Sequence, residues 1–564
     1  MDRHVDAAVA AATGPGESEA PAPEVTHFRQ ILLWPVHLVR PANADLSRDH
    51  AEEFAKLAAG HPWHEVEDEF TGDPGDFQER HYNEFVTFLP PVQRFLYGQG
   101  LGKTAGRSCG RNPIRVMRRR DIAALRLALT PDAAPITLNV AHIDLHFFFD
   151  IDVAILALEV FADNLPLATA QDIMFRLGRA YPAYWEKDGA PGHCPSLFEW
   201  LSSDGQVVAR SDFADRAKYL AHVCKHRAAR IGSHWEFLLR PMVPNDADHD
   251  GRLRYSQLEY YRMPLMAFLA LADVDGLTRA DYVRLALATG AGDRSRLPAT
   301  EGHLADFETQ YCYDRFHKKR EDDDWAGTRF MSCGHAFVVT GSAANPFFAD
   351  LERGLLNAFR HQHFLLFLIA HFHKATLMMF SDRLAEAVNR LDPGDPEAVK
   401  QFRRATKQAL ETFLRFTHRY WFHVVSNQDR ARDLFALNRR HLALDARYEH
   451  IRQEVQEMSQ YLENEVARRQ NDSVVRLTVV TAFGLIGTVA TGFLGMNLFD
   501  HTTLDPAAKV AIFTAVFVPT TLLTFYTIAK SQRLFEFLDA LANEGASPGE
   551  KLRAVGAIWR RKHR

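Results

Sequence analysis

Two long uncharged segments near the C-terminus constrain the fold of this chain more than any other feature. They cover residues 477–499 and 510–529, and a charged residue bounds each of them on both sides. A helix of about 20 apolar residues crosses the hydrocarbon core of a bilayer, and two adjacent runs of this length are rare in one soluble domain. We therefore predict a transmembrane hairpin, with helices at 474–499 and 509–530 and an extracytoplasmic loop at 500–508.

The distribution of lysine and arginine orients this hairpin. The loop 500–508 contains two aspartates and neither Lys nor Arg, whereas the tail 531–564 is basic. Because the cytoplasmic flanks of membrane helices are enriched in Lys and Arg, we expect the tail and the long N-terminal body in the cytoplasm. Residues 1–24 lack the apolar core of a signal peptide and are interpreted as a disordered tail. The predicted location is the inner or plasma membrane, with both termini cytoplasmic.

The composition excludes several classes of protein. The net charge of -5 argues against a general nucleic-acid binder, which normally carries a basic excess. The hydrophobic share of 47% is ordinary for a globular protein, which excludes a membrane protein with many spans. The sequence contains no phosphate-binding loop, dinucleotide fingerprint, nucleophile elbow or paired zinc-ligand motif. We therefore expect no organic cofactor and no enzymatic activity.

The N-terminal body is predicted to be an α/β domain over residues 25–344. Apolar runs rich in β-branched and aromatic residues indicate strands, and stretches with helical periodicity alternate with them. The strand-like segments are 31–39, 143–150, 154–161 and 336–340, and the helix-like segments include 170–179 and 212–230. Segment 154–161 is interpreted as a continuation of the strand before it.

A long helix is predicted to follow this domain. The pattern is helical over 345–427, and Pro-Gly-Asp-Pro at 393–396 predicts a turn between two antiparallel helices. Apolar positions then alternate in steps of three and four through a stalk at 428–473, which predicts one helix continuous with the first span. The positions are Leu434, Leu437, His441, Leu444, Tyr448, Ile451, Val455, Met458 and Leu462. These apolar positions pack either on the chain's own preceding helices or on the same helix of other copies. Both kinds of packing can occur together if they use different faces of the helix.

The outer end of the first span carries the triplet Gly495-Met496-Asn497, followed by the short acidic loop and the second span. This arrangement resembles the CorA-type divalent-cation transporter family, whose signature is a Gly-Met-Asn triplet at the outer end of the first of two C-terminal spans. The resemblance covers roughly residues 430–535. The chain departs from the family at Leu494, where an aromatic residue is usual, and at Pro519, which places the mid-span proline in the second helix.

The resemblance implies a selectivity filter formed by Gly495, Met496 and Asn497. Hydrated Mg²⁺ loses its water reluctantly, so neutral carbonyl oxygens suit a filter that binds the ion together with that water. Stepping back from the filter by three to five residues defines one helix face, the pore face, where oxygen-bearing and apolar side chains alternate. The predicted pore face consists of Asn471, Val474, Leu477, Thr481, Leu485, Thr488 and Gly492. Gly484 and Gly487 are interpreted as close-packing sites between helices.

The family's roles carry over to this face position by position. The pore threonine of the family corresponds to Thr488, the hydrophobic constrictions to Leu485 and Leu477, and the polar ring at the entry to Asn471. One hairpin cannot enclose a pore, and the resemblance implies a homopentamer lined by the first span of each copy. The expected activity is passive flux of a divalent cation, most of all Mg²⁺, down its electrochemical gradient.

Three other interpretations stay open at this point. The chain could transport zinc or another transition metal, as other members of the same family do. It could also be a membrane-tethered sensor or enzyme whose hairpin serves only as an anchor. The basic end of the tail, residues 559–564, resembles the family's collar of positive charge, and binding to anionic membrane lipids is the alternative.

A second candidate site lies in the N-terminal body. Residues 245–251 have the Asp spacing and the Gly of an EF-hand loop, so Asp246, Asp248 and Asp250 are candidate ligands of a regulatory metal. The twelfth position is Gln257, where an EF-hand needs a bidentate Glu, and an Asp-rich turn is therefore the competing interpretation. Two further groups of residues are not predicted to bind metal: four histidines are expected to be buried in the protein, and an acidic run is expected to form a solvated loop. These groups are His361, His363, His371 and His373, and the acidic run at 321–324.

Overall fold

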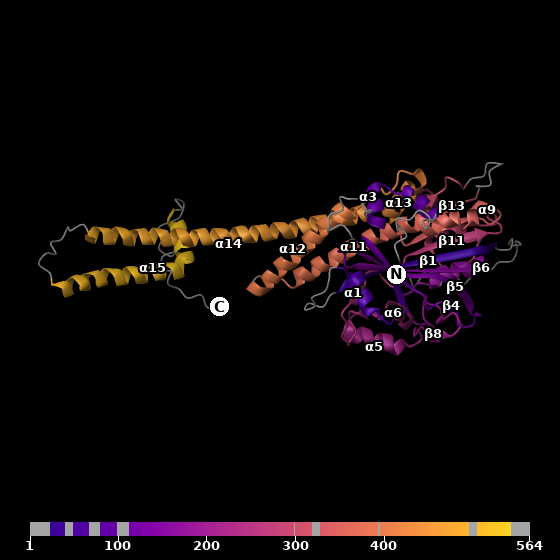
Figure 1. Ribbon diagram of the computed structural model, residues 1–564, viewed down its shortest axis with the longest axis horizontal. Helices are drawn as coiled ribbons and strands as arrows, with labels where there is room; N and C mark the ends of the chain where they lie inside the picture. The colour runs from indigo at the N-terminus through magenta and orange to yellow at the C-terminus, as the bar shows by residue number, and fades with distance from the viewer. Residues whose placement is uncertain are drawn as a thin grey trace. The chain divides into compact units, whose positions relative to one another are not determined.

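The computed structural model describes residues 23–39, 49–66, 79–98, 112–297, 299–317, 327–392, 395–495 and 505–542 (Figure 1). The chain divides into two compact units, Met1–Glu454 and Val455–Arg564, and each is described by itself. The first unit contains a β-sheet domain with its helices. The second contains most of one long helix and the helix that follows it.

A mixed 14-stranded sheet forms the centre of the first unit. Its strands are β1 (Glu24–Val39), β2 (Trp63–Glu65), β3 (Ile114–Arg119), β4 (Ala124–Ala128), β5 (Ile136–Phe148), β6 (Val153–Pro166), β7 (Leu197–Leu201), β8 (Val207–Arg210), β9 (Val243–Pro244), β10 (Arg254–Gln257), β11 (Leu265–Leu271), β12 (Cys312–Tyr313), β13 (Arg329–Ser332) and β14 (Ala336–Ser342). The main path runs β12-β13-β14-β11-β1-β6-β5-β4-β7-β8. Most neighbours are antiparallel, whereas β11 pairs with β14, and β9 with β10, in parallel.

Helices cover the sheet and extend from it. They are α1 (His50–Leu57), α2 (Glu79–Thr87), α3 (Pro90–Tyr97), α4 (Leu167–Arg176), α5 (Arg216–His226), α6 (Ser233–Leu239), α7 (Arg279–Leu287), α8 (Glu301–Gln310), α9 (Pro346–Ala349), α10 (Leu355–Ala358), the π-helix η2 (Phe359–His363), α11 (Phe364–Asn389), α12 (Pro396–Arg419), α13 (Asp429–His441), α14 (Leu444–Gly495) and α15 (Pro506–Ala542). Both α4 and α11 pack on β1 and β6.

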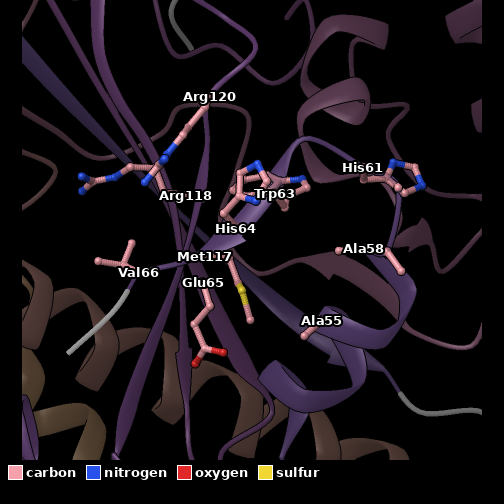
Figure 2. A pocket seen from close by; sticks show the side chains of 12 residues that line it. Ala55, Ala58, His61, Trp63, His64, Glu65, Val66, Met117, Arg118 and Arg120 are labelled. Atoms are coloured by element: carbon pink, nitrogen blue, oxygen red, sulfur yellow. The ribbon is translucent and has the colours of Figure 1, made fainter.

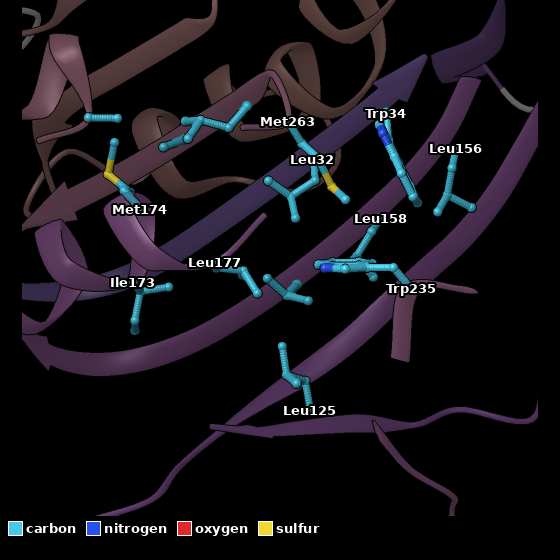
Figure 3. Close-up of a cluster of buried hydrophobic side chains, with 14 of the residues drawn as sticks. Leu32, Trp34, Leu125, Leu156, Leu158, Ile173, Met174, Leu177, Trp235 and Met263 are labelled. Carbon is cyan, nitrogen blue, oxygen red and sulfur yellow. The ribbon is translucent and has the colours of Figure 1, made fainter. Parts of the chain in front are cut away.

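The central strand β1 is buried on both faces of the sheet. Leu32 and Trp34 belong to a buried cluster that includes Ile173 of α4 and Trp235 of α6 (Figure 3). Successive side chains of a strand point to opposite faces, so Ile31 and the buried side chains in step with it point to the other face. A strand buried on both faces reads as an unbroken apolar run rather than as an alternating one. The predicted strand at 31–39 is therefore confirmed, and it begins earlier, at Glu24.

The predicted strand at 143–150 does not continue into 154–161. Residues 149–152 reverse the chain, with Asp150 at φ 64°, and β6 returns antiparallel to β5 in the register Leu145↔Leu156. A turn without Gly or Pro has no strong signal in the sequence, because Asp tolerates the left-handed conformation only with local support. The two helices on either side of residues 393–396 are α11 and α12, and Phe380 of α11 contacts Phe413 of α12.

The predicted continuous stalk helix is wrong at one point. Helix α13 ends at His441, Ala443 adopts φ 52°, and α14 begins at Leu444. The apolar positions of the stalk nevertheless pack on the preceding helices, as one of the two interpretations proposed. Tyr448 stacks on Trp421 with the ring centroids 4.5 Å apart and lies beside Phe413 of α12.

Candidate functional site

The helix that carries the predicted filter is regular up to the filter itself. Helix α14 is unbroken from Leu444 to Gly495, and Gly495 is its last residue. Met496 and Asn497 lie outside the described residues, so the filter triplet stays a prediction. The first predicted span, 474–499, thus follows α14 over all but its final residues.

The pore face is exposed along α14 within the second unit. Side chains at all seven predicted positions are exposed, from Asn471 to Gly492. The apolar members are among the most exposed large hydrophobic residues of the chain, with Val474 at 59%, Leu477 at 67% and Leu485 at 64%. A soluble helix does not leave such a stripe in water without a partner. This face therefore requires a partner such as lipid or further copies of the chain.

The threonine hydroxyls of this helix at 478, 481, 488 and 491 each donate to a backbone carbonyl of the preceding turn. Thr481 donates to the carbonyl of Leu477 at 2.8 Å, and Thr488 donates to the carbonyl of Gly484 at 2.9 Å. A hydroxyl has one hydrogen and two lone pairs, so each oxygen keeps acceptor capacity directed away from its own backbone. Such oxygens present acceptors to a cation and to the water molecules around it.

Helix α14 comes close to α15 at Gly487. An ideal Cβ on Gly487 would lie 2.7 Å from Cγ2 of Thr520, so the two helices approach closely there. Figure 1 shows these helices running side by side in the second unit. At 3.6 residues per turn, Thr488, Leu485 and Thr481 lie roughly 100–160° around the helix from Gly487. The pore face therefore lies beside and opposite the point where α14 meets α15, and Leu477 is its nearest member, at roughly 80° from Gly487.

Two described segments are long and apolar enough to cross a membrane, Leu355–Asn389 and Pro506–Leu523. The first is 72% buried, and its α11 part packs on β1 and β6, so it is a core helix of the sheet domain. The second is 0% buried and overlaps the predicted second span, 509–530, over residues 509–523. Helix length and composition therefore support that span.

The Asp-rich loop does not have the geometry of an EF-hand. Strands β9 and β10, rather than helices, flank it and pair with each other. The Arg254 guanidinium donates to the carbonyls of Asn245 at 2.9 Å and Ala247 at 3.3 Å, so a cationic side chain already satisfies oxygens that a metal ion would use.

Two of the three carboxylates of this loop lie against side chains of α5. The Nε2 of His222 in α5 lies 2.6 Å from Oδ2 of Asp246, and Lys225 forms an ion pair with Asp248. Among the residues that the structure describes, no three His, Cys, Asp or Glu side chains are grouped so that they could hold a metal ion. Asp246, Asp248 and Asp250 are thus not brought together as a metal site, and the contacts support the Asp-rich turn.

The histidines of the helical segment are structural, as predicted. His363, His371 and His373 are buried, and His361 lies 3.2 Å from Glu84. The Nε2 of His373 lies 2.6 Å from the carbonyl oxygen of Tyr420, which ties α11 to the end of α12. The acidic run at 321–324 and the basic run at 559–564 lie outside the described residues.

A hollow of about 850 Å³ lies beside α1 and β2 (Figure 2). Its lining includes His61, His64 and Arg118, but the guanidinium of Arg118 is bound to both oxygens of Asp144 at 2.7 Å. The hollow is open to solvent, and we assign it no role.

Sequence reasoning missed two features of these sites. One is the contact between Gly487 and Thr520: the glycines predicted close packing between helices, but they did not show which residue Gly487 would contact. The other is Arg254, whose position ten residues after Pro244 has no motif that marks it as a ligand of the loop.

The described part of the chain thus combines a sheet domain with a helix, α14, that exposes a face of alternating hydroxyl and apolar side chains. Residues 396–528 match the model of the family described as CorA-like Mg²⁺ transporter protein, so the resemblance seen in the sequence is confirmed for this segment. A search of curated proteins found no match.

Among solved structures, the chain is similar to the CorA magnesium transporter of Methanocaldococcus jannaschii. The sequences are 13% identical, the match covers 51% of this chain and 95% of that chain, and the TM-score is 0.17. A TM-score this low says nothing about the fold. The likeness to the family therefore rests on the match over residues 396–528.

Proposed function

We propose that this protein carries a divalent cation, Mg²⁺ most of all, across a membrane through a pore lined by α14. The observation that carries the proposal is the exposed pore face within the segment that matches the transporter family. This face has threonine oxygens between apolar side chains, on a helix that meets α15 at Gly487. The filter of Gly495, Met496 and Asn497 and the orientation with both termini in the cytoplasm are part of the proposal.

The proposed pore needs several copies of the chain. A single helix with an exposed face encloses no path, and a homo-oligomer with α14 of each copy around one axis would bury this face. A homopentamer is the number that the family resemblance implies. Rings of Thr481 and Thr488 would hold the hydrated ion, and rings of Leu477 and Leu485 would close the path by excluding water.

No source of chemical energy is required in this proposal. An inside-negative potential of 100 mV supplies about 4.6 kcal/mol to a doubly charged ion, which is twice the value for a single charge. Flux is then passive and inward. The ion is the substrate of the protein rather than a resident cofactor.

Reconstitution in liposomes tests the proposal. We expect voltage-dependent Mg²⁺ uptake that Asn497→Ala abolishes and that Thr488→Val lowers about tenfold, because a valine cannot replace a hydrogen bond to the ion's water. Thr514→Val is the matched control, since Thr514 of α15 is exposed, bonds the carbonyl of Val510 at 2.8 Å and lies outside the pore face.

The same assay separates the proposed function from its alternatives. Uptake of Zn²⁺, Co²⁺ or Ni²⁺ in preference to Mg²⁺ would assign the chain to transition-metal transport. Absence of any metal flux, or flux that Asn497→Ala leaves unchanged, would refute the pore.

A further inference from the structure

We propose that Gly487 and Thr520 form a positioning contact that sets the rotation of α14 and with it the direction of the pore face. The inference rests on the proposed function for its consequence, but the contact itself can be tested without any transport. Both residues belong to the second unit.

The contact is specific to one glycine of α14. A Cβ on Gly487 would meet Cγ2 of Thr520 at 2.7 Å, a distance that real Cβ contacts do not show. The same construction on Gly484, one turn earlier, meets nothing within 4 Å. Gly487 is buried, whereas Gly484 is partly exposed. Of these two positions, 487 is therefore the one that requires glycine.

The methyl group of Thr520 is held in place. Its hydroxyl donates to the carbonyl of Val516 at 2.8 Å, which selects one side-chain rotamer and directs Cγ2 toward α14. Pro519 precedes it and removes a backbone hydrogen bond from α15 at this level. A stiff methyl group cannot move aside as the end of a long side chain could. A methyl added at position 487 would therefore push the helices apart or turn α14.

Rotation of α14 would change what the pore face presents. Thr488 is adjacent in sequence to Gly487, so any turn that relieves a clash at 487 also moves the Thr488 oxygen around the helix axis. Small residues allow membrane helices to approach closely, and such contacts set their packing in lipid. Gly487 and Thr520 are thus positioning residues, and neither is proposed to touch the ion.

A disulfide test examines the contact alone. The double variant Gly487→Cys with Thr520→Cys is expected to form a disulfide within one chain, detected by mass spectrometry of the digested full-length protein. The matched pair Gly484→Cys with Thr520→Cys is expected to form little or none. Equal yields from the two pairs, or no disulfide from the first, would overturn the proposal whether or not the protein transports ions.

A flux test examines the consequence. We expect Gly487→Ala to lower Mg²⁺ flux per assembled protein about tenfold, as an overpacked methyl typically does to an equilibrium, and Gly484→Ala to leave it unchanged. Thr520→Ser removes the offending methyl and keeps the hydroxyl, so Gly487→Ala with Thr520→Ser is expected to regain flux. Flux of Gly487→Ala equal to that of Gly484→Ala, or no rescue by Thr520→Ser, would refute the positioning role.

The two tests together separate the failures. If the disulfide forms as expected but the unaltered protein shows no metal flux, the contact stands and the proposed function fails. If the unaltered protein transports Mg²⁺ and the disulfide pattern is absent, the proposed function stands and the contact fails.

Discussion

A buried ion pair inside the sheet domain makes the stability of the fold depend on a single charged residue. The Nζ of Lys374 in α11 lies 2.8 Å from Oε2 of Glu259, which precedes β11. The Glu259 side chain is 2% exposed and that of Lys374 is 14% exposed. An ion pair this deep is weak evidence for stability, but removal of Lys374 leaves the buried Glu259 carboxylate beside the His371 ring, 3.7 Å away, whose pKa burial lowers, in place of a full positive charge.

Lys374→Met is therefore expected to lower the free energy of unfolding by about 3–5 kcal/mol. Chemical denaturation of the full-length protein in detergent, followed by tryptophan fluorescence, measures the change. Lys374→Met with Glu259→Leu should recover most of the loss, because an apolar pair of similar size replaces the ion pair. A single variant as stable as the parent would contradict the buried pair.

At the scale of elements, the break between α13 and α14 is the feature that the apolar pattern did not predict. Arg439 of α13 donates to the carbonyl of Phe422 at 2.7 Å and pairs with Asp445 of α14. Ser332 of β13 donates to Asn438 at 2.8 Å, and the carbonyl of His441 lies against Gly334. These contacts hold α13 against the sheet domain, and α14 restarts with Ala443 in the left-handed region.

A glycine at the break is expected to stabilise the protein. Ala443 has φ 52°, where a side chain costs about 1 kcal/mol and glycine is free of that cost, so Ala443→Gly should raise the midpoint of thermal unfolding. Ala436→Gly is the control, because Ala436 is exposed within α13 and glycine in a helix interior costs about 1 kcal/mol. If α13 and α14 were one continuous helix, both substitutions would destabilise it alike.

At the scale of the whole molecule, buried neutral histidines make the sheet domain sensitive to acid. Burial lowers the pKa of His234 to about 3 and likewise lowers the pKa of His373 to about 3, from 6.5. Both side chains are fully buried, and His234 has no hydrogen-bond partner for either ring nitrogen among the described residues. The unfolded chain thus binds protons on these groups at a pH where the folded chain does not.

Stability is accordingly expected to be complete above pH 6.5 and to fall as the pH drops from 6.5 toward 3. Each such histidine adds a slope of about 1.4 kcal/mol per pH unit in this window. Denaturation of the full-length protein at a series of pH values measures the slope. His234→Phe should reduce it without loss of stability at pH 7, because Phe198 and Phe213 already surround the ring. An unchanged slope would show that His234 is not buried neutral.

Part of this architecture could be predicted because it depends on local properties of the chain. The strand at 31–39, the helices α11 and α12 and the second span are runs whose hydrophobic length or period is set by their own residues. The reversal at 149–152 and the break at Ala443 depend on residues far away in the sequence, and the pairing of β9 with β10 brings Arg254 to the carbonyls of the loop. No local pattern marks those features, since each is a conformation or contact that the surrounding fold stabilises.

The sequence by itself thus determined the presence of two uncharged segments long enough for a bilayer, a Gly-Met-Asn triplet at the outer end of the first of them and a mixed domain before them. The tertiary structure decided how these parts are used. It showed that Arg254 binds the carbonyls of the Asp-rich loop, that α14 starts anew at Leu444, and that Gly487 lies against Thr520. The physical reason is that apolar length and helical period are properties of one segment, whereas the facing of a helix depends on what packs against it.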